Sequence, residues 1–194
     1  MKRSSYTLLI ALLVAIPLIV QAASFWSPFS GGGSDSGLSA TVTPDTSLAS
    51  NSSYLALESL VTVTMSSGTT APAFGSLIVI ATSDGVAPTY KKAIATSTTT
   101  MPAPVQYVVV SVTSPYSTSA PLVMSKGYIR YDSYTALITG RQAFVSSSTS
   151  GVPTGTVPST AGNQVQSIGV GLTLTATPTA KILFFWPSPD VRGL

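Results

Sequence analysis

The chain has 194 residues, enough for one domain of ordinary size and a short leader or anchor. Hydrophobic residues make up 44% of it, so a core can form, but charged residues make up only 8%, against roughly 25% in ordinary soluble domains. The formal net charge is +3, and the basic residues are scattered, with Lys2 and Arg3 at the start. We therefore expect no nucleic-acid partner, since surfaces that bind phosphates have clusters of Lys and Arg.

The sequence contains no histidine and no cysteine. Ser-His-Asp and Cys-His nucleophiles and the common zinc sites are therefore impossible. The six acidic residues are far apart along the chain, and Gly169-Val170-Gly171 lacks the third glycine of a dinucleotide-binding loop. We expect no catalytic residues, no metal site and no cofactor.

Residues 1–22 have the pattern of a secretory signal peptide. The basic pair Lys2-Arg3 precedes 13 apolar residues over 8–20, and small residues then predict cleavage between Ala22 and Ala23. A 13-residue helix rises about 20 Å, less than the roughly 30 Å of a bilayer core. Alternatively, a helix over residues 6–26 spans the membrane and remains as an anchor. Both interpretations place the bulk of the chain outside the cytoplasm.

Residues 23–37 form an aromatic and Gly/Ser-rich linker. Its first part, 25–29, is aromatic, and its second part, 30–37, has the composition of a flexible chain. The linker separates the N-terminal segment from residues 38–194, which we expect to be the folded domain.

The domain is expected to be all-β, a single β-sandwich of the immunoglobulin-like or jelly-roll kind. Short runs with period-two alternation or continuous apolar character are separated by Pro, Gly, Ser and Thr. The turn residues Ser83-Asp84-Gly85 indicate a hairpin. We expect residues 146–162 to form an exposed loop. The expected strands lie within 38–43, 55–65, 77–81, 107–112, 126–138, 141–145, 168–176 and 181–186.

Two further patterns have structural and functional interpretations. Asn51-Ser52-Ser53 fits the N-glycosylation acceptor pattern in a loop-like stretch. Tyr128, Tyr131 and Tyr134 either form a face on which glycans stack or pack in the core and across strands. Packing is the preferred interpretation.

Two apolar segments suggest assembly. In residues 38–43, Leu38, Ala40 and Val42 alternate with polar residues behind a flexible linker. This strand either pairs within its own domain or inserts into a neighbouring subunit by strand donation. The last segment, with Ile182, Phe184 and Trp186, is so apolar that it needs burial in the core or by a partner.

The leader, the tethered N-terminal strand, the lack of cysteine, the hydroxyl-rich sandwich and the Asn51 sequon together resemble the secreted β-sandwich subunits of archaeal surface threads and bundling pili. The resemblance covers the whole chain without a diagnostic motif. It implies a glycosylated, non-enzymatic structural protein at the cell surface that polymerises with itself, with Leu38, Ala40 and Val42 as the donated side chains.

Two alternatives remain open. One is a membrane-anchored accessory or virion structural protein with an exposed β-domain. The other is a subunit that resembles type IV pilins, although the glutamate and glycine common in their leaders are missing near Ser4 and Ser5.

Overall fold

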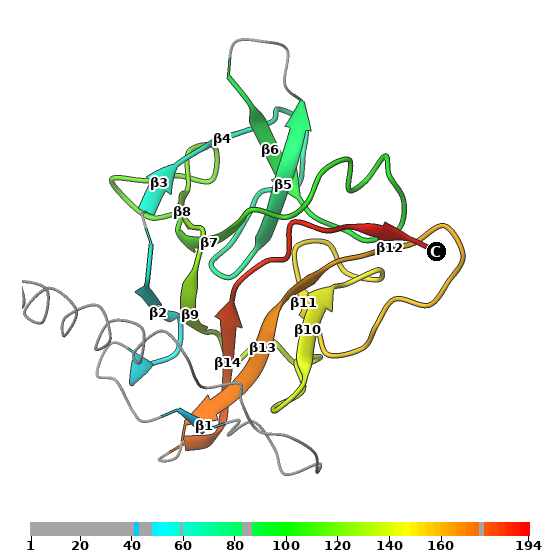
Figure 1. Ribbon diagram of the computed structural model, residues 1–194. Helices are drawn as coiled ribbons and strands as arrows, with labels where there is room; N and C mark the ends of the chain where they lie inside the picture. The colour runs from blue at the N-terminus through cyan, green and yellow to red at the C-terminus, as the bar shows by residue number, and fades with distance from the viewer. Residues whose placement is uncertain (1–40, 43–47, 59, 83–86, 175–176) are drawn as a thin grey trace, which may run out of the picture. The chain divides into compact units, whose positions relative to one another are not determined.

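The structure is a computed structural model that describes residues 41–42, 48–58, 60–82, 87–174 and 177–194 (Figure 1). These residues belong to one compact unit, Ser39–Leu194. Their regular structure consists of strands, with no α-helix among them, which confirms the predicted all-β class. Within the described part of the chain, no helix has the length and apolar character needed to cross a membrane. The predicted leader with Ala22 and Ala23, and the linker over 23–37, lie outside the described residues.

The first sheet, sheet A, has seven strands and is built around a long antiparallel hairpin. This hairpin joins β13 (Ser167–Leu174) to β14 (Thr177–Phe185), and β1 (Thr41–Val42) pairs with β13 in parallel. The remaining order is β11 (Pro153–Thr154) and β10 (Gln142–Val145) on the β13 side, and β9 (Gly127–Arg130) and β2 (Ser53–Ala56) on the β14 side.

The second sheet, sheet B, closes on itself. Its order is β3 (Leu60–Thr62), β8 (Leu122–Met124), β7 (Tyr107–Ser111), β5 (Leu77–Thr82), β6 (Thr89–Lys92) and β4 (Thr64–Met65). The two end strands, β3 and β4, are separated only by Val63. One run of chain therefore pairs with β8 at its start and with β6 at its end, which makes the sheet a small barrel. A separate two-stranded sheet joins β12 (Gln164–Val165) to β15 (Arg192–Gly193).

The alternation of side chains along sheet B divides its apolar residues between two cores. Ile78, Val109 and Val123 belong to one buried cluster together with Val63, Met65 and Tyr90, on the side of the strands that faces the barrel interior. Their chain neighbours on the opposite side join the larger cluster, which also holds residues of sheet A. That larger cluster lies between the sheets and includes Leu77, Val79, Val108, Met124, Ile129, Leu183 and Phe185. The two sheets thus share a core, as in a sandwich, while sheet B also encloses a core of its own.

Two glycines allow the strands to approach closely around Phe185. Phe185 is fully buried and stands opposite Gly169 on one side and Gly127 on the other. Gly169 has φ +142°, and a Cβ there would lie 1.8 Å from the carbonyl oxygen of Phe184. Gly127 has φ +153°, and its Cβ would lie 2.3 Å from the carbonyl oxygen of Leu55. No larger residue fits either position without moving the backbone.

Candidate functional site

The first candidate site is the edge of sheet A, where β1 meets β13. Thr41 stands opposite Thr173 and Val42 opposite Leu174 in a parallel register. Strand β10 pairs with the earlier part of β13, from Ser167 to Val170, so β1 continues the same edge beyond the end of β10. Of the predicted donor residues, Val42 lies in β1, whereas Leu38 and Ala40 lie outside the described residues. The segment predicted for donation therefore pairs, in this chain, with its own domain.

The face of β13 and β14 next to this edge is apolar. Leu172, Leu174, Ala180 and Ile182 form a buried cluster, and Phe184 packs against it from a half-buried position. The strand-donation hypothesis depends on an acceptor with apolar side chains beside the pairing edge. The edge at β13 has that character.

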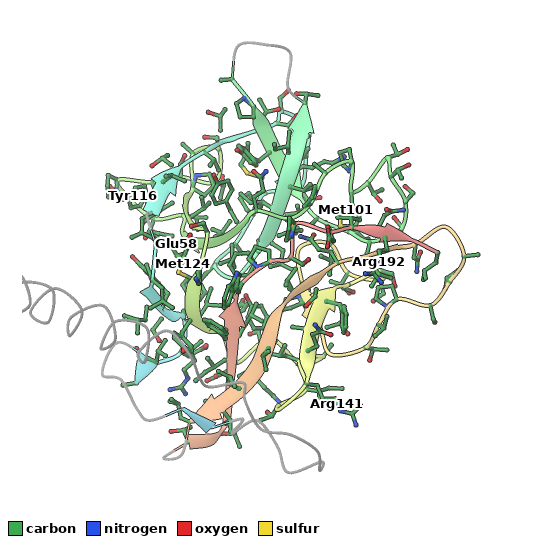
Figure 2. The ribbon with its side chains drawn as sticks, in the orientation of Figure 1. Glu58, Met101, Tyr116, Met124, Arg141 and Arg192 are labelled. Atoms are coloured by element: carbon green, nitrogen blue, oxygen red, sulfur yellow. The ribbon has the colours of Figure 1, made fainter. Side chains whose placement is uncertain are left out.

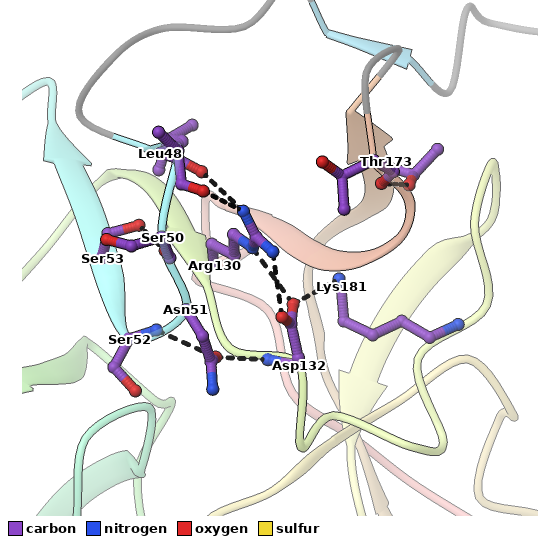
Figure 3. A network of polar contacts seen from close by, with 11 residues as sticks. Leu48, Ser50, Asn51, Ser52, Ser53, Arg130, Asp132, Thr173 and Lys181 are labelled. Carbon is purple, nitrogen blue, oxygen red and sulfur yellow. Dashed lines mark hydrogen bonds and ion pairs between the residues drawn. The ribbon is translucent and has the colours of Figure 1, made fainter.

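Arg130 holds the backbone between β1 and β2 in place (Figure 3). Its side chain is 8% exposed, and its Nη1 donates hydrogen bonds to the carbonyl oxygens of Leu48 at 3.2 Å and Ala49 at 2.6 Å. Its Nε and Nη2 donate to the two carboxylate oxygens of Asp132, at 3.2 and 3.0 Å. A guanidinium can bind the two backbone carbonyls and the carboxylate at once because it has five N–H donors in a fixed, planar arrangement.

Asp132 extends this network to β14 and to the segment just before β2. Its Oδ1 accepts a hydrogen bond from the backbone N–H of Lys181 at 3.1 Å, and its own N–H donates to Asn51 Oδ1 at 2.9 Å. The hydrogen bonds from Arg130 are the main reason that the pKa of Asp132 lies below its ordinary value; partial burial opposes them, and the Lys181 N–H and the Arg130 charge add to the lowering. We call Arg130, Asp132 and the backbone of 48–51 the arm clamp.

The predicted glycosylation residue, Asn51, is part of the same network. Its side chain is exposed, and its Oδ1 accepts from the N–H groups of both Ser52 and Asp132. Ser53, the third residue of the acceptor pattern, donates its hydroxyl to the carbonyl of Ser50. The amide oxygen thus orients the side chain. Attachment of a glycan at this asparagine stays a prediction.

The three tyrosines that suggested a glycan-stacking face lie in different environments. Tyr134 is buried and donates its hydroxyl to the carbonyl of Gly75 at 2.7 Å, and burial raises its pKa well above the ordinary value. Tyr131 packs edge-on against Tyr134, with ring centroids 5.2 Å apart. Tyr128 stacks on Phe184 across the β9–β14 pair at 4.8 Å. Core and cross-strand packing therefore accounts for all three.

The predicted C-terminal apolar strand occupies the middle of sheet A, between β13 and β9. Ile182 is fully buried and Phe184 is half-buried, but Trp186, just beyond the end of β14, is 55% exposed. The apolar character of this segment predicted burial in the core or by a partner, and within this chain Trp186 is not buried. The chain instead leaves the sheet at Pro187, so the indole lies at the surface.

The second candidate site is a groove of about 460 Å³ at the crossing between the sheets. Here the link from β2 to β3 runs beside the link from β8 to β9, with the N–H of Leu57 bonded to the carbonyl of Lys126. Glu58, labelled in Figure 2, lies in the first of these two links. The groove is lined by Glu58, Pro104, Val105, Gln106, Tyr107, Ser125, Lys126, Trp186, Pro187, Ser188 and Pro189.

The polar groups of the groove contact one another. Lys126 Nζ lies 3.7 Å from Glu58 Oε1 and 4.0 Å from the centroid of the Trp186 ring. Ser125 donates its hydroxyl to Glu58 Oε2 at 3.0 Å. Glu58, Lys126 and Trp186 thus form one connected surface.

Buried Gln166 holds two walls of the groove together. It is 1% exposed; its Oε1 accepts from the N–H of Val105 at 2.7 Å, and its Nε2 donates to the carbonyls of Val105 and Ser188. Every polar atom of the amide therefore has a partner.

Neither Arg130 nor Gln166 was predicted from the sequence as a functional residue. A single charged residue in the otherwise uncharged run 127–130 could have indicated a buried ion pair at Arg130. No feature of the sequence indicated a special role for Gln166. Among the described residues, no group of three or more acidic side chains lies close enough together to hold a metal ion.

Comparison with known proteins adds no relative: no protein-family model, no curated protein and no solved structure matches the chain.

Proposed function

We propose that this chain is an extracytoplasmic structural subunit of a cell-surface filament, such as a pilus or thread, and that its subunits join by β-strand donation. The observation that carries the proposal is the pairing of Thr41–Val42 with Thr173 and Leu174 in β13. An N-terminal segment that adds to a sheet edge within one chain can add to the same edge of a neighbour, because all its contacts are then reproduced between identical subunits.

The connection between β1 and the domain suits such an exchange. Residues 43–47 separate β1 from Leu48, where the arm clamp begins, and an extended chain of this length spans roughly 20 Å. Tension on the arm is carried at Leu48 and Ala49 by the bonds from Arg130. A subunit that is pulled along a filament benefits from such an anchor, because the load stays local to sheet A.

The composition of the chain supports the same proposal. With 8% charged residues, copies can pack against one another with few charges to bury. The immunoglobulin-like or jelly-roll sandwich is supported by the core that the two sheets share. The closure of sheet B is a barrel feature and goes beyond that expectation.

Deletion of residues 38–43 tests the proposal. The variant should be exported as soluble monomers, and electron microscopy should find no filaments. A control that reshuffles the glycines and serines of 30–36 should polymerise normally. A synthetic peptide of residues 37–43 should bind the deletion variant and should bind the full chain much more weakly, because its edge is already occupied. Filaments of normal length from the deletion variant would refute strand donation.

A further inference from the structure

The groove between the sheets has the chemistry of a ligand site. Its most exposed aromatic group is the Trp186 indole, with 55% of its surface accessible. Tryptophan has a strong preference for burial of its large apolar area, and when it is exposed beside polar groups it commonly marks a binding surface. The position of Trp186 in a groove of about 460 Å³, within the usual size of small-molecule sites, sets it apart from an isolated surface residue.

The walls of the groove are held in place before any ligand arrives. Gln166 bridges the backbone of Val105 and of Ser188, which belong to the two lining segments 104–107 and 186–189. Gly127, directly after Lys126, lets β9 and β2 approach closely next to these links. A groove fixed by buried hydrogen bonds loses little conformational entropy when it binds a ligand.

The charges in the groove favour an uncharged ligand. Glu58 and Lys126 are its two charged lining residues, and they neutralise each other at 3.7 Å. A phosphate or carboxylate ligand would meet the Glu58 carboxylate, and a cationic ligand would meet Lys126. Neither sign of charge has an advantage here.

The hydrogen-bonding groups favour a ligand that donates as well as accepts. The carboxylate of Glu58 can only accept, and the Ser125 hydroxyl and the Lys126 ammonium contact it without using all its lone pairs. An extended proline-rich segment offers carbonyl acceptors and few donors, so it leaves Glu58 unmatched. Sugar hydroxyls both donate and accept, and the C–H face of a pyranose ring packs on an aromatic face.

We propose that this groove binds an uncharged oligosaccharide. One pyranose ring packs on the surface of Trp186 that Lys126 leaves exposed. Its hydroxyls hydrogen-bond to Glu58, Lys126 and the exposed amide of Gln106. The site is separate from the β1–β13 edge, so it gives a structural subunit a second activity, attachment to glycans.

Tryptophan fluorescence tests the proposal directly. The chain has two tryptophans, so Trp26→Phe leaves Trp186 as the single reporter in the full-length protein. The probes are cellohexaose, maltohexaose, xylohexaose and the hexamer of N-acetylglucosamine, with a decaproline peptide as the competing class. We expect a saturable change in emission with at least one oligosaccharide and none with decaproline.

Variants in the otherwise native chain assign the binding to the groove by calorimetry. Trp186→Ala should abolish binding, and Glu58→Gln should weaken it by about tenfold, as expected for one hydrogen bond to a charged group. Val157→Ala is the matched control, since Val157 is 49% exposed and lies outside the groove lining; it should bind normally.

Three outcomes overturn the proposal. The first is the absence of a saturable change with all four sugars up to about 10 mM, a concentration above the millimolar range of weak specific binding. The second is sugar binding that persists in Trp186→Ala. The third is binding of decaproline and of none of the sugars. None of them bears on strand donation, because filament formation is scored separately.

Discussion

Arg130 and Asp132, two residues apart at the end of β9, form a two-point ion pair, with Nη2 and Oδ2 3.0 Å apart and Nε and Oδ1 3.2 Å apart. The remaining nitrogen of Arg130 reaches two backbone carbonyls more than 80 residues earlier in the chain. This one guanidinium therefore joins β9, the loop after it and the segment that precedes β2. Its removal leaves acceptors without donors in three places.

Arg130→Leu should lower the free energy of unfolding by about 2–4 kcal/mol, because Leu48, Ala49 and Asp132 lose their charged donor. Urea unfolding followed by circular dichroism measures this. Arg141→Leu is the control, since Arg141 is exposed, and its effect should stay within about 0.5 kcal/mol. Equal effects of the two substitutions would contradict the role of the clamp.

The arm clamp should also make stability depend on acid pH. The pKa of Asp132 is lowered in the folded state, mainly by the hydrogen bonds from Arg130. The stabilisation is therefore complete above the unfolded aspartate pKa of about 4, and it is lost as the pH falls through the lower folded value. Melting temperatures between pH 7 and pH 2 should fall less steeply in Asp132→Asn than in the native chain. Parallel curves would show that Asp132 does not contribute.

The glycine at position 169 should be irreplaceable. Gly169→Ala combines φ +142° with a Cβ 1.8 Å from a backbone oxygen, so we expect a loss of more than about 3 kcal/mol or a failure to fold. Gly162→Ala separates the two causes. Gly162 also has positive φ, but its added Cβ would meet open space, so the cost should be about 1 kcal/mol in the same urea assay. Similar losses in both variants would mean that the close approach has no effect.

Gln166→Leu should destabilise the domain by about 2–4 kcal/mol, because it leaves the N–H and C=O of Val105 and the C=O of Ser188 without their buried partner. Thermal unfolding by calorimetry checks this. Gln106→Leu is the control: Gln106 follows Val105 but is exposed, so the change should be nearly neutral. A stable Gln166→Leu variant would contradict the view that this amide holds the walls of the groove.

Sequence patterns predicted the all-β class and located β5, β7, β10, β13 and β14, because these strands are long or strongly apolar. The patterns missed β6, whose Thr-Tyr-Lys-Lys sequence is polar, and β8, which has only three residues and follows a proline. The loop predicted over 146–162 contains the short β11 and the buried Gly151.

The barrel closure and the groove could not be predicted for a different reason. Closure depends on β3 and β4 pairing with strands about 60 and 25 residues later, and local alternation carries no information on distant partners. The groove combines four separate segments. Trp186 is exposed because β14 ends at Phe185, whereas the apolar run in the sequence ends one residue later, at Trp186.

Strand donation is tested most directly by a cysteine pair at Thr41 and Thr173, which are opposite each other in β1 and β13. The chain has no cysteine, and opposed residues on paired strands have the Cα separation that a disulfide needs. Filaments of the variant with Thr41→Cys and Thr173→Cys would be oxidised and run on a denaturing gel without reductant, with Thr41→Cys alone as the control. Strand donation predicts a ladder of covalent multimers from the double variant and nothing beyond dimers from the single variant. A single monomer band with an internal disulfide, from intact filaments, would contradict it.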